Sequence, residues 1–522
     1  MSSSSSKINE RGFLSTILGL YVILIGIGLP LVVKNGYFDI LVVKYSYYYI
    51  CTIFMSLLVL GYFIKVIARQ PSVFFEKISL KRILEKCTIV DYSILIYLIV
   101  SILSTITSDY RYESFWGNEG RFTGLFLIFW YVVSYFCVSR FWRVKGWYID
   151  AILAGGIIVC LFGITDYFNL DIFRFRVNVI QEQKMIFTST IGNINTYTSY
   201  VGIIMAISSV LFTTDRTSKS MLWHYVCVVI SFLAIIMGVS DNAYLSLGAL
   251  FAFLPLYLFK SRKGIRRYTI LLATFFLVIQ CVDWINSYYK DVVLGTDGIF
   301  TVIADSGALI YVVLGLWGLV VLWYLLEYIR KDKYKEYGNI FRYIWVVFLL
   351  LIMLFLIYIL YDCNILNNTE RYGSLNGYLL FNDAWGTHRG YIWRNAIECF
   401  SKFSLWKKLI GFGPETFGIL LLNQTKGNPY NEIFDGAHNE YLQLLLTIGI
   451  AGLTSYVIFI LSCIKRCLSR KIDNPFAIAL AFGVICYSVQ AFVNLNLPIV
   501  TPVFWLLLGM GTARSMKCNK DL

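Results

Sequence analysis

Charged residues are scarce in this sequence, and their scarcity excludes a soluble globular protein. Only 15% of the 522 residues are charged, 58% are hydrophobic, and the mean hydropathy is +0.68. A soluble chain of this length needs far more polar surface, so lipid must solvate most of it. The net charge of +14 does not call for a nucleic-acid partner, because the positive-inside rule of membrane proteins explains it.

Motifs for binding nucleotides and structural metals are also missing. No Gly-rich phosphate loop ends in Lys-Ser or Lys-Thr, and the twelve cysteines follow no metal-ligand spacing. The first apolar run, 13–33, lacks a small-residue cleavage site, which predicts a retained span rather than a signal peptide. Cys363 and Cys399 share one long loop and could form a disulfide or stay free, since only their shared location supports pairing.

What the sequence does contain is a series of apolar runs of about 20 residues, the length that crosses roughly 30 Å of hydrocarbon. They predict an all-α, polytopic membrane protein with about fourteen transmembrane helices. The segment 283–307 is apolar enough to dip back into the membrane. The predicted spans are 13–33, 47–66, 89–107, 122–139, 149–165, 192–213, 221–239, 243–259, 268–285, 308–328, 343–361, 438–462, 475–493 and 499–513.

The distribution of Lys and Arg orients these spans. With the N-terminus in the cytoplasm, the cytoplasmic segments hold 30 of the 45 Lys and Arg residues, including Lys77, Lys81, Arg82 and Lys86 in 67–88. An even number of spans then places both termini in the cytoplasm. We therefore expect an N-terminal membrane region, 1–361, a large extracytoplasmic loop, 362–437, and a C-terminal membrane region, 438–522.

The large loop carries more cations than its predicted side requires. It holds seven Lys and Arg residues, whereas all other extracytoplasmic loops together hold eight. Such an excess is consistent with an anionic ligand. Long loops also cross membranes regardless of their charge, so these residues could equally be solvated surface. The seven are Arg371, Arg389, Arg394, Lys402, Lys407, Lys408 and Lys426.

Histidine is rare, and two of the three histidines, His388 and His438, belong to this region. His438 lies where the polar loop meets the apolar run, three residues after Asp435, a residue type that commonly caps helices. The positive end of that helix favours anions, and Asn439 would share a face with Gln443. A histidine at such a wet boundary suits a general base, although it could equally cap a helix or bond a carbonyl.

Arginine residues supply the candidate phosphate contacts. Arg389 and Arg394 lie five residues apart in HRGYIWRN, and the planar guanidinium fork suits phosphate. Trp393 between them could bury the segment at the interface or stack on a sugar ring. Arginines near a membrane surface, such as Arg389 and Arg394, also bind lipid headgroups or backbone carbonyls. Arg121, in GNEGRFTG at the outer end of the fourth span, is a further candidate, although polar residues at span ends are usually only interfacial. The extracytoplasmic segments contain no Asp-x-Asp pair, so we expect Arg and Lys, and no metal, to neutralise phosphate.

Several of these motifs, and the order in which they follow one another along the chain, resemble those of the O-antigen ligase and polymerase superfamily of bacterial membrane glycosyltransferases. The similar stretches are Arg389-Gly390 before Trp393, GFGPETF at 411–417, and HNEYLQLLLTIGIAGL from His438 with Gly449 and Gly452. GNEGRFTGLF around Arg121 and IGNINTYTSY at 191–200 resemble weaker upstream motifs. The similarity begins near residue 110 and is specific across about 385–455.

The resemblance implies a GT-C-like fold and a metal-independent, cofactor-free glycan transfer at the outer face of the bacterial cytoplasmic membrane. A polyprenyl-diphosphate-linked glycan would be the donor, and a hydroxyl of a glycan, wall polymer or lipid the acceptor. By position, His438 would be the base, Arg389 a diphosphate clamp and Arg121 a second clamp, with Arg394, Trp393 and Asn439 binding substrate. An arginine of the family's pattern is replaced here by Asn242, and His388 matches no family position.

Two further interpretations stay open from sequence. A polysaccharide polymerase of the same superfamily shares these motifs and differs only in its acceptor. A lipid-linked glycan flippase would suit the number of spans, but it should carry cations within the membrane along its path. Here the predicted spans have almost none, which favours chemistry at the membrane surface.

Overall fold

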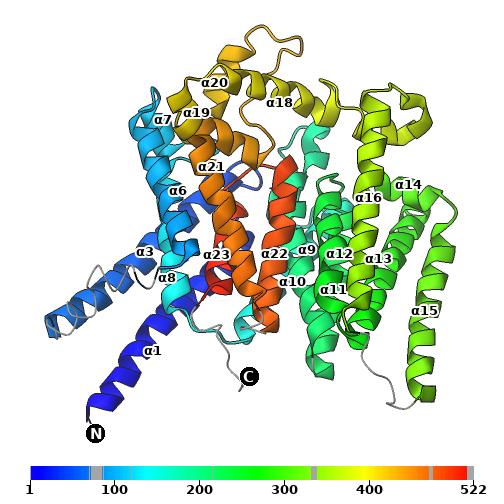
Figure 1. The fold of residues 1–522 in the computed structure, drawn as a ribbon, viewed down its shortest axis with the longest axis horizontal. Coiled ribbons are helices and arrows are strands. Elements are labelled where there is room, and N and C mark those ends of the chain that lie inside the picture. The colour runs from blue at the N-terminus through cyan, green and yellow to red at the C-terminus, as the bar shows by residue number, and fades with distance from the viewer. Residues whose placement is uncertain are drawn as a thin grey trace. The chain divides into compact units, whose positions relative to one another are not determined.

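The protein is an all-α polytopic membrane protein, seen in a computed structural model (Figure 1). The predicted cytoplasmic residues Lys77, Lys81, Arg82 and Lys86 lie outside the part that the structure describes. A single two-stranded antiparallel sheet, with Phe187 opposite Asn193, accompanies the helices in that part. The described residues are 2–69, 71, 85, 87–118, 120–215, 217–330, 338–469 and 474–513.

Each of the fourteen predicted spans coincides with an apolar helix. Within the described residues, eleven helices are long and apolar enough to cross a membrane, and three predicted spans form shorter helices of 17, 16 and 11 residues. The shortest, α23 (Thr501–Gly511), would cover only about 16 Å at 1.5 Å per residue. All eleven of its residues are buried, so protein rather than lipid surrounds it.

The chain divides into two compact units. Unit 1 comprises Met1–Val159, Cys399–Val484 and Ala491–Leu522, and unit 2 comprises Cys160–Glu398 and Ile485–Gln490. Three helices run from one unit into the other along the chain: α9 (Trp147–Tyr167), α18 (Trp385–Ser401) and α22 (Pro475–Gln490).

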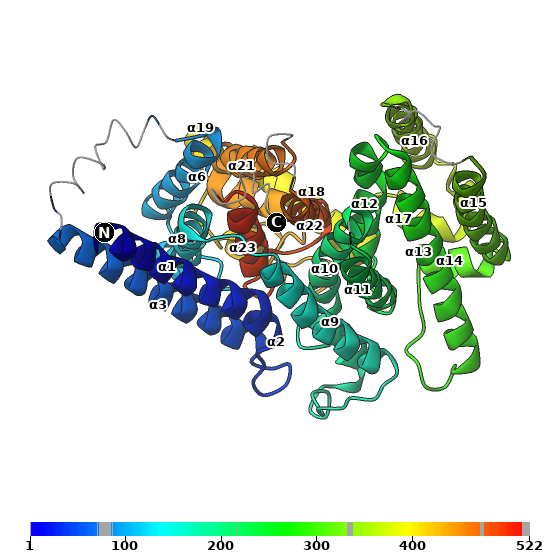
Figure 2. The same cartoon turned by 90° about the horizontal axis from the view of Figure 1, so that it is seen from below.

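Unit 1 is built around α21, which packs against α6, and α23, which packs against α8; α1 and α3 run side by side (Figures 1 and 2). The segments 107–124 and 399–439 meet at one end of these helices, which we call the loop end of unit 1. The elements are α1 (Ser2–Ile23), η1 (Leu24–Gly28), α2 (Leu29–Leu31), α3 (Ile40–Arg69), α6 (Ile89–Ile106), α7 (Arg111–Trp116), α8 (Leu125–Phe141), α19 (Leu405–Ile410), α20 (Phe417–Gln424), α21 (Glu440–Cys467), η4 (Ala491–Val493) and α23.

The central helix of unit 2 is α10, whose membrane-spanning stretch is completely buried. It packs against α11, α12 and α13 (Figure 2). The segment 283–307, whose apolar sequence could dip into the membrane, consists of the end of α13, a connection and the short α14. The elements are η2 (Gln181–Ile186), β1 (Phe187–Thr188), β2 (Gly192–Asn193), α10 (Ile194–Thr214), α11 (Ser218–Ile236), α12 (Ala243–Leu258), α13 (Arg262–Tyr288), α14 (Ile299–Asp305), α15 (Leu309–Arg330), α16 (Ile340–Asn364), η3 (Thr369–Leu375) and α17 (Asn376–Leu379).

One predicted span begins earlier than the sequence suggests, and it contains a cation. The span predicted at 47–66 is α3, which starts at Ile40 and includes the fully buried Lys44. The Lys44 ammonium donates hydrogen bonds to the carbonyl oxygens of Leu29 and Pro30, at 2.6 and 2.8 Å. These carbonyls lie at the C-terminal end of α2, where helices leave acceptors unsatisfied, so Lys44 has a structural partner there.

Candidate functional site

Arg389 stands at a sharp turn of the chain in unit 2. Gly386, Thr387 and His388 all have φ between 59° and 66°, and the regular part of α18 follows them. A Cβ on Gly390 would lie 1.9 Å from the Asn382 carbonyl oxygen, so only glycine fits there. The Arg-Gly pair of the sequence motif thus combines a cation with the one residue that permits this close packing.

The Arg389 side chain lines a cavity of about 240 Å³. Its walls come from the start of α10, the turn between α11 and α12, the 297–300 segment and the turn before Arg389. Most of its lining side chains are polar, among them Asp241, Asn242, Tyr244 and Asp297. The Asp241 carboxylate accepts a hydrogen bond from the Tyr378 hydroxyl at 2.9 Å. The cavity is therefore large enough for a polar group of several atoms.

Arg389 combines a positive charge with a position at the wall of a polar cavity. No hydrogen bond or ion pair joins its guanidinium to another side chain among the residues that the structure describes. Burial lowers the pKa of the Arg389 guanidinium from its ordinary value, and the Asp241 carboxylate opposes that shift. Because the ordinary pKa of arginine lies far above neutral pH, the group stays charged. A partly desolvated cation without a hydrogen-bonding partner binds a phosphate strongly.

The two other candidates on α18 are placed differently. Arg394 makes an exposed two-pronged ion pair with Asp383, with nitrogen–oxygen distances of 3.0 and 2.7 Å. Its guanidinium also lies 5.4 Å from the centre of the Tyr391 ring. The half-buried Trp393 packs against Trp385, with ring centres 5.2 Å apart. These contacts tie α18 to the segment before it, and they leave Arg389 as the arginine of this helix that faces a cavity.

His438 lies in the turn that precedes α21, in unit 1. The sequence suggests Asp435 as the N-cap, but that is wrong: Asn439 caps the helix, and its side-chain oxygen accepts from the Leu442 amide at 3.0 Å. His438 has φ 46° and lies outside the helix. The Ala437 amide donates to the Gln443 side chain at 3.2 Å. The turn that carries the histidine is thus fastened to the first turns of α21.

The glycines of the two downstream motifs form one joint at the loop end of unit 1. Gly449, with φ 67° and ψ −174°, interrupts α21. The carbonyls of Leu446 and Thr447 accept hydrogen bonds from the amides of Phe412 and Gly413, at 3.2 and 2.8 Å. A Cβ on Gly449 would lie 2.4 Å from the Leu409 backbone. The GFG stretch and the spaced glycine of α21 are therefore needed for one close backbone contact.

Arg121 also belongs to the loop end of unit 1, where it pairs with Asp435. Its Nε and Nη2 donate to the two carboxylate oxygens of Asp435 at 3.2 and 2.5 Å. The arginine is buried, at 8% exposure, while the Asp435 side chain is 67% exposed. The sequence predicts a diphosphate contact for Arg121, whereas in the structure a carboxylate occupies its fork.

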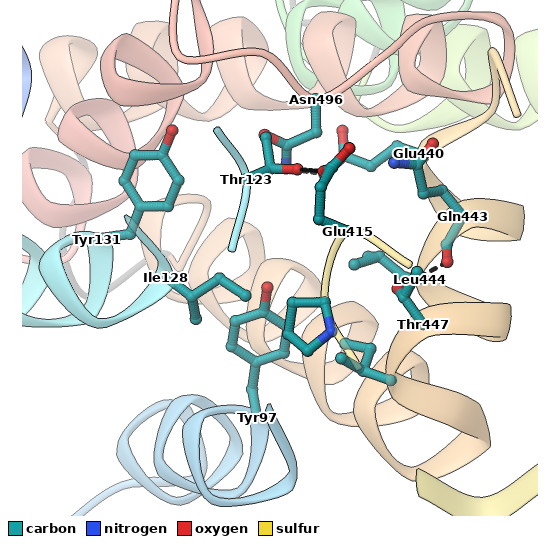
Figure 3. Close-up of a pocket in the computed structure, with 12 residues that line it drawn as sticks. Tyr97, Thr123, Ile128, Tyr131, Glu415, Glu440, Gln443, Leu444, Thr447 and Asn496 are labelled. Atoms are coloured by element: carbon teal, nitrogen blue, oxygen red, sulfur yellow. Dashed lines mark hydrogen bonds between the residues drawn. The ribbon is translucent and has the colours of Figure 1, made fainter. Parts of the chain in front are cut away.

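A second cavity of about 40 Å³ lies beside this pair (Figure 3). Glu415, from the GFGPETF motif, and Glu440, the first residue of α21, both line it, together with Thr123 and Asn496. Thr123 donates to the Glu415 carboxylate, and the hydroxyl of Tyr456 donates to Glu440 at 2.6 Å. The space holds only a few water molecules, so it is no place for a sugar.

Glu415 is buried, and burial raises the pKa of its carboxyl, although Thr123 and Arg121 partly oppose the shift. The folded protein therefore holds this proton more tightly than the unfolded chain does. Stability from this group is complete below the unfolded pKa, near 4.5, and is lost as the pH rises through the higher folded pKa.

We accordingly expect Glu415→Gln to unfold at a higher temperature than the wild type at pH 8, by roughly 1–3 °C. The amide can still accept from Thr123 and carries no buried charge. The gain should vanish near pH 4, and the exposed Glu370→Gln should show no gain at either pH. Thermal unfolding in detergent measures the unfolding temperature of the wild type and of both variants at each pH. If Glu415→Gln were less stable than the wild type at pH 8, the attraction of the Glu415 carboxylate to Arg121 would outweigh the cost of its burial.

Several site features have no signal in the sequence. The contacts of Arg121 with Asp435, and of Thr123 with Glu415, join residues about 300 positions apart. Cys363 and Cys399, which could have formed a disulfide, are both buried, and neither belongs to a disulfide within the described residues. In the described part of the chain, no three His, Cys, Asp or Glu side chains gather in a way that could hold a metal ion.

One known family matches a segment of the sequence that contains these motifs. The O-antigen ligase family model matches residues 292–457, a segment that contains Arg389, the GFGPETF stretch and His438. No curated protein sequence matches the chain. The resemblance noted from the motifs is thereby confirmed for this segment: residues 292–457 match the O-antigen ligase family, and the chain that carries them is a multi-pass membrane protein.

Proposed function

We propose that this protein transfers a glycan from a polyprenyl-diphosphate carrier to an acceptor hydroxyl at the outer face of the bacterial cytoplasmic membrane. Both termini would lie in the cytoplasm, and the 362–437 loop would face outward. The observation that carries the proposal is the match of residues 292–457 to the O-antigen ligase family, joined to a charged Arg389 that faces a polar cavity and has no hydrogen-bonding partner among the described residues.

In the proposed reaction, the acceptor oxygen attacks the anomeric carbon of the first sugar. The bond between that carbon and the diphosphate oxygen breaks, and its electron pair leaves with the polyprenyl diphosphate. His438 takes the proton of the acceptor hydroxyl, which general-base catalysis requires as the new bond forms. Arg389 binds the diphosphate and stabilises the negative charge that grows on it. The role of Arg389 is proposed from its surroundings in unit 2, and the role of His438 from its surroundings in unit 1.

The acceptor would be a glycan, a wall polymer or a lipid, and the superfamily includes both ligases and polymerases. We favour the ligase, because the matching family model describes an O-antigen ligase. Product length separates the two: a ligase attaches a finished glycan once, whereas a polymerase returns a ladder of products.

Transfer in the purified protein is expected to persist in excess EDTA and without any nucleotide. Arg389, as proposed, neutralises the diphosphate itself, so no metal ion is required for that purpose. The test reconstitutes the protein in lipid vesicles with a polyprenyl-diphosphate-linked oligosaccharide and an acceptor, and follows the lipid-linked sugar by chromatography. If EDTA stopped transfer and Mg²⁺ restored it, the metal-independent mechanism would be wrong. If no lipid-linked glycan were consumed under any condition, the proposed reaction itself would fail.

A further inference from the structure

We propose that Arg121 is a positioning residue: through its ion pair with Asp435, it holds the 435–439 turn that presents His438 to the acceptor. This inference rests on the proposed function of His438 as the base. It replaces the direct contact with the diphosphate that the motif around Arg121 suggests.

The first argument is that the Arg121 fork is already occupied. Nε and Nη2, the two nitrogens that would grip a phosphate side by side, donate to the two oxygens of Asp435 at 3.2 and 2.5 Å. A two-pronged pair of this kind fixes direction as well as distance. To bind a diphosphate in the same way, Arg121 would have to release Asp435.

The backbone around Asp435 is shaped to this contact. Gly436 lies against the guanidinium, and a Cβ there would come within 2.8 Å of Cζ and both terminal nitrogens of Arg121. Any larger residue would push the arginine aside. The fit therefore involves both the carboxylate and the glycine that follows it.

Arg121 itself comes from a firmly held segment. The Asn118 side chain donates to the Glu415 carbonyl oxygen at 3.0 Å, and Thr123 donates to the Glu415 carboxylate. These bonds join residues on both sides of Arg121 to the GFGPETF stretch. Arg121 therefore holds Asp435 in a fixed position relative to the GFGPETF stretch.

The far side of the turn is fixed separately. Asn439 caps α21, and the Ala437 amide bonds to Gln443. His438 lies between these anchors with φ 46°, a strained conformation that surrounding contacts must hold. The Asp435 contact supplies the anchor on the N-terminal side, so its loss should loosen the histidine without removing any group that touches the donor.

The decisive variant is Asp435→Asn, which keeps the size of an exposed side chain and removes its charge. If Arg121 positions His438, kcat for transfer should fall by roughly 10- to 100-fold, because small misplacements of a base are costly. The KM for the lipid-linked donor should stay within about twofold of the wild type. If Arg121 instead bound the diphosphate, removal of the competing carboxylate would lower the donor KM and leave kcat intact.

The matched control is Glu327→Gln, because Glu327 also forms an ion pair with an arginine, Arg266, outside the loop that carries the candidate site. Its kcat and KM should equal those of the wild type. Gly436→Ala, which changes no charge, should reproduce the low kcat and unchanged KM of Asp435→Asn.

The opposite results would overturn the inference: an unchanged kcat in Asp435→Asn, or a rate loss that appears in the donor KM. Failure of the proposed function would look different. In that case His438→Asn would transfer glycan at the wild-type rate, whatever the effect of Asp435→Asn.

Discussion

Replacement of His438 by Asn is expected to lower the rate of glycan transfer by roughly 10²- to 10⁴-fold, with little effect on the affinity for the lipid-linked donor. Asn is chosen because His438 has φ 46°, and Asn tolerates this left-handed backbone better than most residues. The variant keeps the turn but cannot accept a proton from the acceptor hydroxyl. Single-turnover transfer in vesicles measures the chemical step apart from donor binding.

Two additions make this prediction specific to a base. A His438→Gly variant, which leaves space for a small base, should regain part of its rate when imidazole is added. His224→Gln is the matched histidine control, because His224 pairs with Asp215 in unit 2 at 2.5 Å and is assigned no part in transfer. A His438→Asn protein that is folded and transfers at the wild-type rate would refute the assignment.

The helices could be predicted from sequence, and the reason is physical. A span must bury about 20 apolar residues in hydrocarbon, so its length and composition are visible in one stretch of chain. The start of α3 at Ile40 cannot be predicted in the same way, because this part of the helix contains Lys44 and a lysine inside a span needs a partner. Its partners, the carbonyls of Leu29 and Pro30, come from a different helix and cannot be read locally.

The candidate site was predictable only in part. Arg389 and His438 carry motif signals, and the structure adds that Arg389 faces a cavity. The pairing of Arg121 with Asp435 has no such signal, because nothing near either residue specifies a partner 314 positions away. The buried state of Glu415 was likewise hidden, since it depends on how distant segments pack around it.

The error at the start of α21 shows the limit of local rules. Asp435 and Asn439 are both good capping residues, and they lie four positions apart. The helix begins at Glu440, because the Asn439 side chain reaches the Leu442 amide while Arg121 occupies the Asp435 carboxylate. A tertiary ion pair therefore decided between two caps that were equally acceptable in sequence.

The second large effect is expected for Arg389→Ala, which should raise the donor KM by roughly 30- to 150-fold. A charge-assisted hydrogen bond contributes about 2–3 kcal/mol, and each 1.4 kcal/mol is a factor of ten in affinity. Arg389 lies at the cavity and has no hydrogen-bonding partner in the part of the chain that the structure describes, so no ion pair seen there has to be broken before it binds an anion. Arg389→Lys keeps the charge but loses the planar fork, and its KM should fall between those of the wild type and the alanine variant.

Inhibition by free polyprenyl diphosphate tests the same contact without turnover. In Arg389→Ala, the affinity for polyprenyl diphosphate should fall by about the factor by which the donor KM rises. The affinity for polyprenyl monophosphate should fall less, because this compound offers fewer oxygens to the guanidinium fork. Arg371→Ala, an exposed arginine of the same loop at 64% side-chain exposure, is the control and should leave both constants unchanged. If Arg371→Ala and Arg389→Ala weakened inhibition by both compounds to the same extent, the effect would come from the general positive charge of the loop and not from Arg389 itself. Loss confined to Arg389→Ala would instead identify this guanidinium as the group that binds the diphosphate.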